Sequence, residues 1–357
     1  MAKIFVTGAT GQVGSQVVRY IITEKKLDVT RPEDVICLVR NPDKAAKLKE
    51  LGVTITEGDL LDSDTISDIM NSGIDYVFHI AANILLNQTY EQMYKPNVLG
   101  TRLMLNAFVK SKAKCFIYTS SIAVYEAFND RVKTYTIYEN SPIGPLDGLP
   151  YTVTKRIAEN IVNDYSKRHP DKKFVTTRLG PIVGAGDRQT IPNLVKLLSY
   201  RALPKLINKG KNLLSITSPI DVARAQVYLV EYNDDISGEE YNIALEPISY
   251  KEIMDVIAEY YNRNPPTFSV QYWFFRLLLP LLRVLNKIFP KFELIKIALS
   301  PIAISYIGKT LIYSSNKLKA LGFEYKISYR QAIIDSLVDL DPDKELVKPS
   351  IGLKFKK

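Results

Sequence analysis

The sequence has few of the residues that build metal sites and disulfides. Its 357 residues include only two cysteines and two histidines. With so few soft ligands we do not expect a structural zinc site, and we expect His79 and His169 to be packed or surface residues. Cys37 and Cys115 fall in the second and fifth predicted strands, which are not neighbours in a sheet ordered 3-2-1-4-5. A disulfide between them is therefore not expected.

We expect neither a leader nor a membrane-spanning run in this sequence. The chain begins Met1-Ala2-Lys3 and enters a strand-like stretch at residue 4, which leaves no room for a signal peptide. We therefore expect a cytoplasmic protein. Residues 272–290 are rich in Leu, Phe and Trp but are interrupted by three basic residues, whereas a bilayer span needs about 20 predominantly apolar residues.

Acidic residues are scarce toward the carboxyl end. From Pro265 onward there are 15 Lys and Arg against 7 Asp and Glu, which accounts for +8 of the net charge of +9. We expect residues 348–357 to form a basic tail. Such a charge serves nucleic-acid binding, contact with an anionic membrane, or solubility alone. Because no nucleic-acid motif accompanies it, we expect no nucleic-acid partner.

What the sequence does contain is a regular alternation of strand-like and helix-like segments. Short β-branched runs occur at residues 3–7, 35–39, 53–56, 76–80, 115–119 and 174–178, and helical periodicity at 11–23, 42–51, 63–70, 90–110 and 151–168. This alternation predicts an α/β fold, with a Rossmann doubly wound parallel sheet over residues 1–180. Beyond it, shorter elements with helices near 220–231, 250–261, 315–321 and 328–337 predict a smaller C-terminal substrate-binding lobe over 181–347. We expect the chain to cross between that lobe and the Rossmann sheet.

A glycine-rich turn follows the first predicted strand and opens the first helix. It reads GATGQVG over residues 8–14. Gly8 permits a tight turn, Gly11 lets the backbone approach a pyrophosphate, and Gly14 lets the helix pack close to the strand. The helix N-terminus then offers unpaired amides to the phosphates. This context predicts a dinucleotide site rather than a plain strand-to-helix turn, with contacts from Gly8, Thr10, Gly11, Gln12, Val13 and Gly14.

The end of the second predicted strand indicates which dinucleotide is bound. NAD sites usually place an acidic residue there, on the ribose 2′-hydroxyl, whereas a basic residue suits the 2′-phosphate of NADP. The strand ends Leu38-Val39-Arg40-Asn41, without an acid. Arg40 can clamp a phosphate through two hydrogen bonds. We therefore favour NADP over NAD, the alternative being that Arg40 is an ordinary surface arginine.

Tyr151 and Lys155 lie four residues apart, on one face of a predicted helix. A phenol with its ordinary pKa of ~10 is a poor base at neutral pH, but a nearby ammonium favours the phenolate and makes proton exchange with a substrate hydroxyl feasible. Ser121 follows the fifth strand, where ligands bind in doubly wound sheets, and its hydroxyl can donate to a substrate carbonyl. The same spacing at Tyr313 and Lys317 follows no comparable strand, so we interpret that pair as non-catalytic.

At these residues the chain resembles the extended short-chain dehydrogenase/reductase family, and the resemblance covers nearly the whole length. The matching motifs occur in family order. They are TGATGQVG from Thr7, GDLLD from Gly58, HIAA from His79, NVLGT from Asn97, TSSIAVY from Thr119 and YTVTK from Tyr151.

The resemblance implies roles for the candidate residues. Tyr151 would donate or accept the proton, Lys155 would also bond the nicotinamide ribose, and Ser121 would orient the substrate. Asn97 would support Lys155 through water, the alternative being a helix N-cap. The remaining cofactor contacts would come from Asp59 and Leu60 at the adenine end, from Ala81 and Ala82 along the channel, and from Pro181. Family members often dimerise through the helices at 90–110 and 151–168, so we expect a homodimer.

The branch of the family is indicated by what the later motifs lack. Members acting on nucleotide sugars read R-x-x-N after the sixth strand and carry an Arg-Gly-Asp-like element that holds the diphosphate. Here Arg178 precedes Leu-Gly-Pro, residues 307–310 read IGKT, and Glu126 stands at a frequent glycine position. LVRNPDKA from Leu38, RLGPIVGAGD from Arg178 and SSNKLKALGF from Ser314 are similar to the branch containing 3β-hydroxysteroid dehydrogenases and dihydroflavonol 4-reductases.

That branch implies an NAD(P)-dependent oxidoreductase acting on a hydrophobic alcohol or ketone, such as a sterol-, flavonol- or lipid-like molecule. The alternatives are a nucleotide-sugar epimerase or dehydratase, and a non-catalytic cofactor sensor. Residues 272–290 fit an apolar substrate, with Arg276, Arg283 and Lys287 on one helical face. This segment is either a lid whose charges face water or a helix in contact with a membrane interface, and both remain open.

Overall fold

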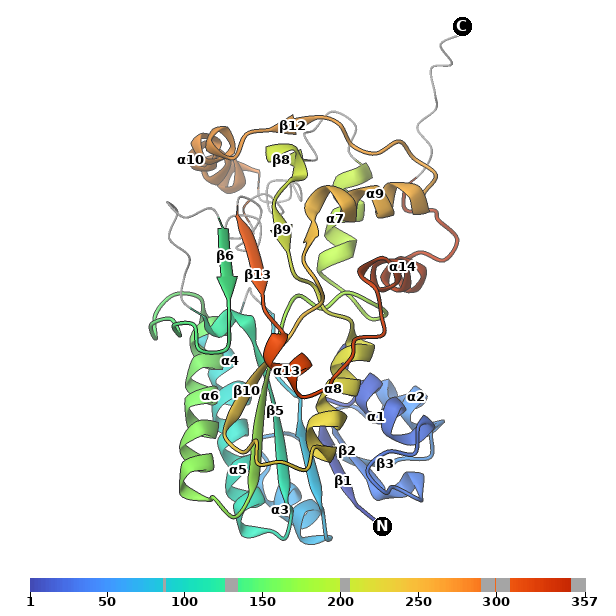
Figure 1. The fold of residues 1–357 in the computed structure, drawn as a ribbon, viewed down its shortest axis with the longest axis vertical. Helices are drawn as coiled ribbons and strands as arrows, with labels where there is room; N and C mark the ends of the chain where they lie inside the picture. The colour runs from blue at the N-terminus through green and yellow to red at the C-terminus, as the bar shows by residue number, and fades with distance from the viewer. Residues whose placement is uncertain (86–87, 126–133, 200–205, 290–298, 300–308, 348–357) are drawn as a thin grey trace, which may run out of the picture.

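The computed structural model describes residues 1–85, 88–125, 134–199, 206–289, 299 and 309–347. Its main feature is a seven-stranded parallel sheet with the strand order β10-β7-β5-β4-β1-β2-β3 (Figure 1). The strands are β1 (Ile4–Thr7), β2 (Val35–Val39), β3 (Thr54–Glu57), β4 (Tyr76–His79), β5 (Cys115–Ser121), β7 (Lys173–Leu179) and β10 (Glu239–Ile243). The predicted 3-2-1-4-5 order is confirmed, and the Rossmann α/β fold with it.

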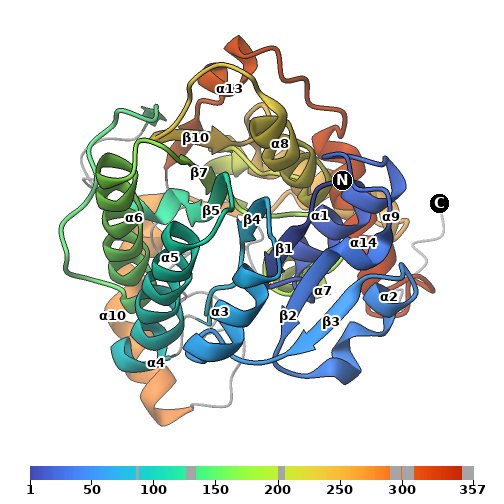
Figure 2. The same cartoon turned by 90° about the horizontal axis from the view of Figure 1, so that it is seen from below.

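Helices cover both faces of this sheet (Figure 2). On one face lie α1 (Gln12–Thr23), α2 (Ala46–Lys49) and α8 (Pro219–Glu231), and on the other α3 (Ser63–Asn71), α5 (Thr101–Lys110) and α6 (Pro150–Arg168). Consecutive strand residues enter opposite cores because side chains alternate across a sheet. Ile4 and Val6 pack toward α1, whereas Phe5 packs toward α3 and α5. Burial on both faces explains why these strands are continuously apolar.

The two cysteines occupy strands that β1 and β4 keep apart. Cys37 lies in β2 and Cys115 in β5, and both thiols are free and buried. The prediction that they do not pair is confirmed. Burial raises the pKa of each thiol to about 12, which leaves them as unreactive core residues.

The second lobe lies at one end of the large sheet. Its elements are the strands β6 (Thr134–Ile137), β8 (Leu206–Ile207), β9 (Leu213–Leu214), β11 (Ile248–Ser249), β12 (Ser269–Val270) and β13 (Thr310–Tyr313), with the helices α7 (Thr190–Ser199), α9 (Tyr250–Tyr260), α10 (Tyr272–Ile288), α13 (Asn316–Ala320) and α14 (Tyr329–Leu340). A separate apolar core joins α7, α9 and α14. The chain crosses between the lobes, because β6 joins the small sheet while α8 and β10 return to the large one. The predicted tail at 348–357, Glu126 and residues 307–308 lie outside the described residues.

The helix expected over residues 90–110 is interrupted by a turn of π-helix. It consists of α4 (Tyr90–Tyr94), a π-helical segment at Lys95–Gly100 and then α5. Pro96 stands in the interruption, and proline removes a backbone donor from the helical ladder. Such bulges re-aim side chains, often at functional sites. This one contains Asn97.

Candidate active site

The glycine turn at the end of β1 is built so tightly that side chains do not fit. Gly8 has φ +72°, and a Cβ on it would lie 2.7 Å from the backbone nitrogen of Ala81. A Cβ on Gly14 would lie 2.2 Å from the carbonyl oxygen of Gly8. The Gly11 amide donates to that same oxygen at 2.9 Å. The turn therefore requires glycine at positions 8 and 14 for steric reasons, which is the geometry a pyrophosphate-binding turn needs.

The turn opens directly onto the N-terminus of α1. Gly11 is the N-cap and supplies no side chain to the first amides of the helix, which include those of Gln12 and Val13. Unpaired amides at a helix start form an anion site. The Gln12 side chain donates to the carbonyl of Gly184 at 3.3 Å, which ties the turn to the loop after β7. Thr10 is exposed beside it. These residues fit a dinucleotide pyrophosphate.

The predicted adenine-end residues surround the ends of β2 and β3. Arg40 follows the last residue of β2 and is exposed. Asp59 is exposed too, and its carboxylate accepts from the amide of Leu61 at 2.9 Å. Leu60 is buried, and its side chain packs so close to Gly100 that a Cβ added to Gly100 would collide with it. Since β1, β2 and β3 pair in parallel, Arg40 and Asp59 lie at the same end of the sheet as Gly8, where the carboxyl ends of these strands meet.

A buried chain of hydrogen bonds links this end of the sheet to the π-helical turn. The Ala81 amide donates to Thr7 Oγ1 at 3.3 Å, and Thr7 Oγ1 lies 2.9 Å from His79 Nδ1. His79 Nε2 lies 2.9 Å from Thr101 Oγ1, which donates to the carbonyl of Asn97 at 2.7 Å. Because the Thr101 hydroxyl donates its proton to that carbonyl, its oxygen can only accept from His79. The ring must therefore donate from Nε2 and accept at Nδ1. Burial lowers the pKa of His79 to about 3, so the ring is neutral.

Asn97 connects α6 to the segment after β4. Its side-chain oxygen accepts from the amide of Asn83 at 2.7 Å, and its nitrogen donates to the carbonyl of Asn83 at 3.0 Å. The same nitrogen donates to Thr154 Oγ1 at 3.1 Å, next to Lys155 in α6. The alternative reading of Asn97 as a helix N-cap is wrong, because it lies inside the π-helical segment. Asn97 is held near Lys155 by this hydrogen bond to Thr154, the residue that precedes Lys155 in α6.

Lys155 is, like Asn97, almost completely buried. It is 3% exposed, and its ammonium donates to the carbonyl of Thr119 in β5 at 2.7 Å while lying 5.0 Å from the centre of the Tyr118 ring. Burial lowers the pKa of Lys155 to about 8, and the nearby carboxylate of Glu159 opposes the shift. The positive charge of Lys155 in turn contributes to the lowered pKa of His79. A cation is thus held in the core beneath the carboxyl end of β5.

Ser121 and Tyr151 belong to the two elements that position Lys155, β5 and α6. Ser121 is the last residue of β5, and its hydroxyl accepts from the amide of Ala123 at 3.2 Å. Tyr151 is the second residue of α6, half-buried, with its carbonyl accepting from Thr154 Oγ1 at 3.0 Å. Burial is the largest cause of the raised pKa of Tyr118, and the charges of Glu159 and Tyr151 add to it.

Two further residues that the sequence analysis assigned to the cofactor, Pro181 and Ala82, follow the strands β7 and β4. Pro181 comes two residues after β7, and its carbonyl accepts from the amide of Thr217 at 2.9 Å. Ala82 is half-buried beside Ala81.

The second tyrosine–lysine pair is divided between two elements. Tyr313 lies in β13 and Lys317 in α13, where the lysine donates to the carbonyl of Glu240 at 2.8 Å.

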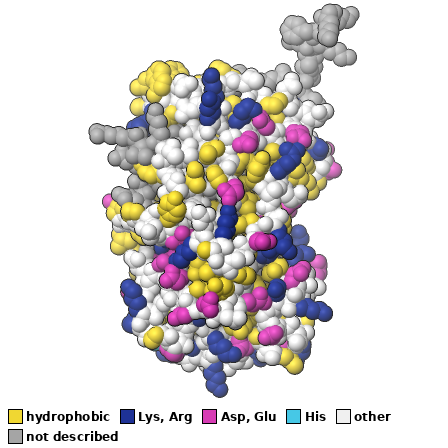
Figure 3. Space-filling view, in the orientation of Figure 1, with side chains coloured by type: hydrophobic (Ala, Val, Ile, Leu, Met, Phe, Trp, Pro, Cys, Tyr) yellow, Lys and Arg dark blue, Asp and Glu magenta, His cyan; other side chains and the backbone are white. Residues whose placement is uncertain are grey.

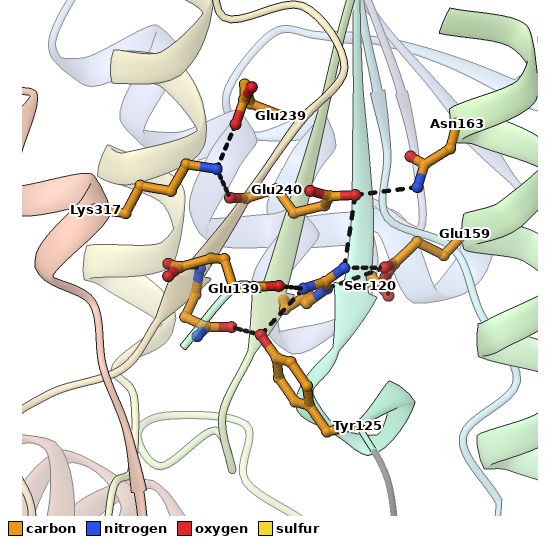
Figure 4. Close-up of polar contacts among 10 residues, drawn as sticks. Ser120, Tyr125, Glu139, Glu159, Asn163, Glu239, Glu240 and Lys317 are labelled. Atoms are coloured by element: carbon orange, nitrogen blue, oxygen red, sulfur yellow. Dashed lines mark hydrogen bonds and ion pairs between the residues drawn. The ribbon is translucent and has the colours of Figure 1, made fainter. Parts of the chain in front are cut away.

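The sequence reasoning missed a buried ion pair directly behind the site. Arg178 of β7 and Glu159 of α6 are 3% and 4% exposed, and the guanidinium Nε donates to the carboxylate at 3.0 Å (Figure 4). The other carboxylate oxygen accepts from Ser120 Oγ at 2.5 Å. The sequence did carry a signal: Glu159 follows Lys155 by one helical turn, on the face that packs against the sheet.

This pair anchors a larger polar cluster, which we call the Arg178 cluster and define by Ser120, Tyr125, Glu139, Glu159, Arg178, Glu240 and Asn242. Arg178 also donates to the Tyr125 hydroxyl at 3.1 Å and to the carbonyl of Glu139 at 2.7 Å. Burial alone would lower the pKa of Arg178, but the Glu159 carboxylate outweighs it and holds the pKa above its ordinary value. Arg178 is therefore committed to the core and does not face a ligand.

The buried ammonium of Lys155 predicts a measurable pH dependence of stability. Between pH 8 and 10.5 the unfolded chain binds a proton at Lys155 that the folded protein releases, so the free energy of unfolding rises with pH across this window. Below pH about 8 both states are charged and the contribution is constant. We expect the difference between wild type and Lys155→Met, from urea unfolding of the cofactor-free protein, to rise by up to about 1.4 kcal/mol per pH unit. A difference that stays flat across this window would contradict the buried position of the ammonium.

Comparisons with known proteins agree with this geometry. Residues 4–244 match the model of the family described as NAD dependent epimerase/dehydratase. The chain is 28% identical over 274 residues to a putative dihydroflavonol 4-reductase of Synechocystis, covering 75% of each chain. It is 26% identical over 297 residues to a decarboxylating sterol-4-alpha-carboxylate 3-dehydrogenase of Mus musculus, covering 80% of each. The crystal structure of a UDP-glucuronic acid 4-epimerase from Bacillus cereus in complex with NAD shares the fold, with a TM-score of 0.72 and 20% identity, covering 95% of this chain and 99% of that one.

Proposed function

The chain belongs to the NAD dependent epimerase/dehydratase family, and from that premise we propose that it is an NAD(P)-dependent oxidoreductase acting on a hydrophobic alcohol or ketone. The observation that carries the proposal is the hydrogen-bonded chain from Ala81 through His79 to Asn97, which joins the glycine turn to the helix of Tyr151 and Lys155. A dinucleotide site and a proton-exchange pair are thus parts of one rigid unit.

The bound cofactor would supply or accept a hydride, and the chain's residues would handle the proton. Tyr151 exchanges it with the substrate hydroxyl. Lys155, held at the carbonyl of Thr119, places a positive charge that favours the phenolate. Ser121 offers a hydroxyl to the substrate oxygen as negative charge develops there. The glycine turn and the first amides of α1 would hold the pyrophosphate, because no side chain fits where it approaches.

The substrate class is argued from which charges are available for binding. A nucleotide-sugar enzyme needs cations directed at a diphosphate, but Arg178, the arginine that opens the R-x-x-N position, is fully engaged with Glu159, Tyr125 and Glu139. Two of the relatives bear names of enzymes acting on a dihydroflavonol and on a sterol carboxylate, both of which contain a bulky ring system. These points support a hydrophobic substrate.

A paired measurement tests this substrate class. We expect the protein to oxidise reduced nicotinamide with bulky cyclic ketones, and we expect UDP-glucuronic acid to leave its melting temperature unchanged. The second candidate function, a nucleotide-sugar epimerase or dehydratase, rests on relatives that bear such names, a UDP-glucose 4-epimerase of Erwinia amylovora and a dTDP-D-glucose 4,6-dehydratase of Dictyostelium discoideum. Stabilisation by a nucleotide sugar without ketone turnover would favour it. Cofactor binding with neither response would favour a sensor without catalysis.

We also propose that NADP is preferred over NAD. Arg40 is exposed at the carboxyl end of β2, where the adenine ribose lies in this fold, and β2 ends without an acid. Replacement of Arg40 by Ala is expected to weaken NADPH binding about tenfold or more, since a charge-assisted bidentate contact is lost, and to leave NADH binding unchanged. Fluorescence titration with both cofactors measures this. Arg19→Ala, an exposed arginine on α1, is the control; a wild-type preference for NADH would refute the assignment.

A further inference from the structure

The helix α10 displays an apolar stripe that faces away from the protein. Trp273, Leu277, Leu281, Val284 and Ile288 are 63%, 68%, 54%, 54% and 61% exposed. Their spacing of four, four, three and four residues places them on one side of the helix. A monomeric protein rarely exposes a contiguous stripe of large apolar side chains unless it is an interaction site.

The opposite side of α10 faces the protein. Leu279 is its buried residue, and Phe275, Leu282 and Asn286 are half-buried on the same side. If α10 were only a lid with its charges toward water, polar residues would occupy the outward face. Instead the outward face is apolar, so the helix has two apolar sides, and the described residues of the chain cover only one of them.

Charge identifies what covers the other side. Arg276, Arg283 and Lys287 are exposed and lie along one edge of the apolar stripe, and residues 272–290 contain no aspartate or glutamate. Cations beside an apolar stripe are the pattern of a helix that lies in the interface of an anionic bilayer. Trp273, near the start of the helix, belongs to the residue type that favours the headgroup level of a membrane.

The position of α10 leaves this surface accessible. It lies at the lobe end of the molecule, far from the N-terminus and the lower edge of the large sheet (Figure 1). Hydrophobic side chains gather at this corner of the surface (Figure 3). Across the described part of the chain, no helix has the length and apolar character to cross a bilayer. Contact with a membrane would therefore be by lying on it.

We infer that α10 docks the protein on an anionic lipid bilayer, with the stripe from Trp273 to Ile288 inserted among the acyl chains and the flanking cations at the headgroups. Binding of this kind depends on buried apolar area together with attraction to anionic lipid. The inference goes beyond the proposed reaction and does not depend on it, because docking requires neither cofactor nor turnover. It would also bring a hydrophobic substrate to the enzyme from the phase in which such molecules dissolve.

Trp273 makes the test direct, because it is the single tryptophan of the chain and lies in the stripe itself. The full-length protein would be mixed with vesicles of phosphatidylcholine and phosphatidylserine, or of phosphatidylcholine alone. Binding is read by sedimentation and by tryptophan emission. We expect co-sedimentation and a blue shift with anionic vesicles at low salt, and weaker binding at about 1 M salt, where the Debye length is about 3 Å.

Matched variants separate the stripe and its charges from general effects. Leu277→Glu should abolish binding, whereas Val338→Glu, an equally new charge at a 49% exposed position on α14, should not. Reversal of Arg283 and Lys287 to Glu should lower vesicle affinity at least about tenfold. Reversal of the exposed Lys47 and Lys49 on α2 should change it little. Circular dichroism and thermal unfolding confirm that each variant is folded.

Three results would overturn the inference, and the first two concern the stripe's partner. One is the absence of any co-sedimentation or blue shift with anionic vesicles at low salt. The other is a lipid-independent dimer, seen by analytical ultracentrifugation, that Leu277→Glu dissociates and Val338→Glu does not; a second copy of the chain would then cover the stripe. Equal loss of binding in the Leu277 and Val338 variants would likewise show that the stripe has no special role.

Discussion

Tyr151→Phe is expected to lower kcat by about 10²- to 10⁴-fold while leaving the dissociation constant of the cofactor within about twofold of wild type. The change removes only the phenolic oxygen that exchanges the substrate proton. Tyr151 stands at the second position of α6, and the buried ammonium of Lys155 one turn later favours its ionised form. Single-turnover rates with reduced nicotinamide and a bulky ketone, beside a cofactor titration, measure both quantities.

The control for this variant is Tyr313→Phe. Tyr313 has the same spacing to a lysine, Lys317, but lies in β13 of the small sheet, and Lys317 lies in the separate helix α13. Removing its hydroxyl should therefore leave turnover unchanged. Full activity of Tyr151→Phe would end the assignment of this residue as the proton donor. Loss of cofactor binding together with turnover would instead indicate that the tyrosine acts structurally.

The second large effect concerns the stability of the Arg178 cluster. Glu159→Leu is expected to destabilise the protein by about 3–5 kcal/mol, because it leaves the buried guanidinium of Arg178 with only the more distant and partly exposed carboxylate of Glu240, 3.6 Å away. Both side chains are less than 5% exposed. Ser120 also loses its hydrogen-bond acceptor, the second oxygen of the same carboxylate. Urea unfolding of the cofactor-free protein measures the change.

A double variant distinguishes an uncompensated charge from lost packing. Replacing both members of the pair, Glu159→Leu with Arg178→Met, removes the isolated charge and should recover a large part of the lost stability. The exposed pair Arg330–Glu259 on the surface provides the comparison, and Glu259→Leu should change stability little. If the double variant is as unstable as the sum of its two single variants, the charges do not stabilise one another and the interpretation of the cluster fails.

Short-range patterns were sufficient to predict the framework of the molecule. The strand order, the helices on both faces and the separation of Cys37 from Cys115 follow from alternating periods of two and 3.6 residues and from the handedness of βαβ units. The glycine turn could be assigned because its steric requirement is local: Gly8 needs positive φ, and Gly14 approaches the carbonyl of Gly8 only six residues back. The interruption at Lys95–Gly100 was not predicted, since the helical pattern continues through it.

The sequence by itself determined which residues are candidates for the chemistry and which faces are apolar, because spacing along a helix or strand specifies neighbours within one turn. The tertiary structure decided which residues far apart in the sequence come into contact. It placed Asn97 against Thr154 and paired Arg178 with Glu159. It also turned the apolar stripe of α10 outward. A periodic pattern indicates whether a side chain is buried or charged. Which residue that side chain contacts depends on how distant segments of the chain pack, and local spacing does not specify this packing.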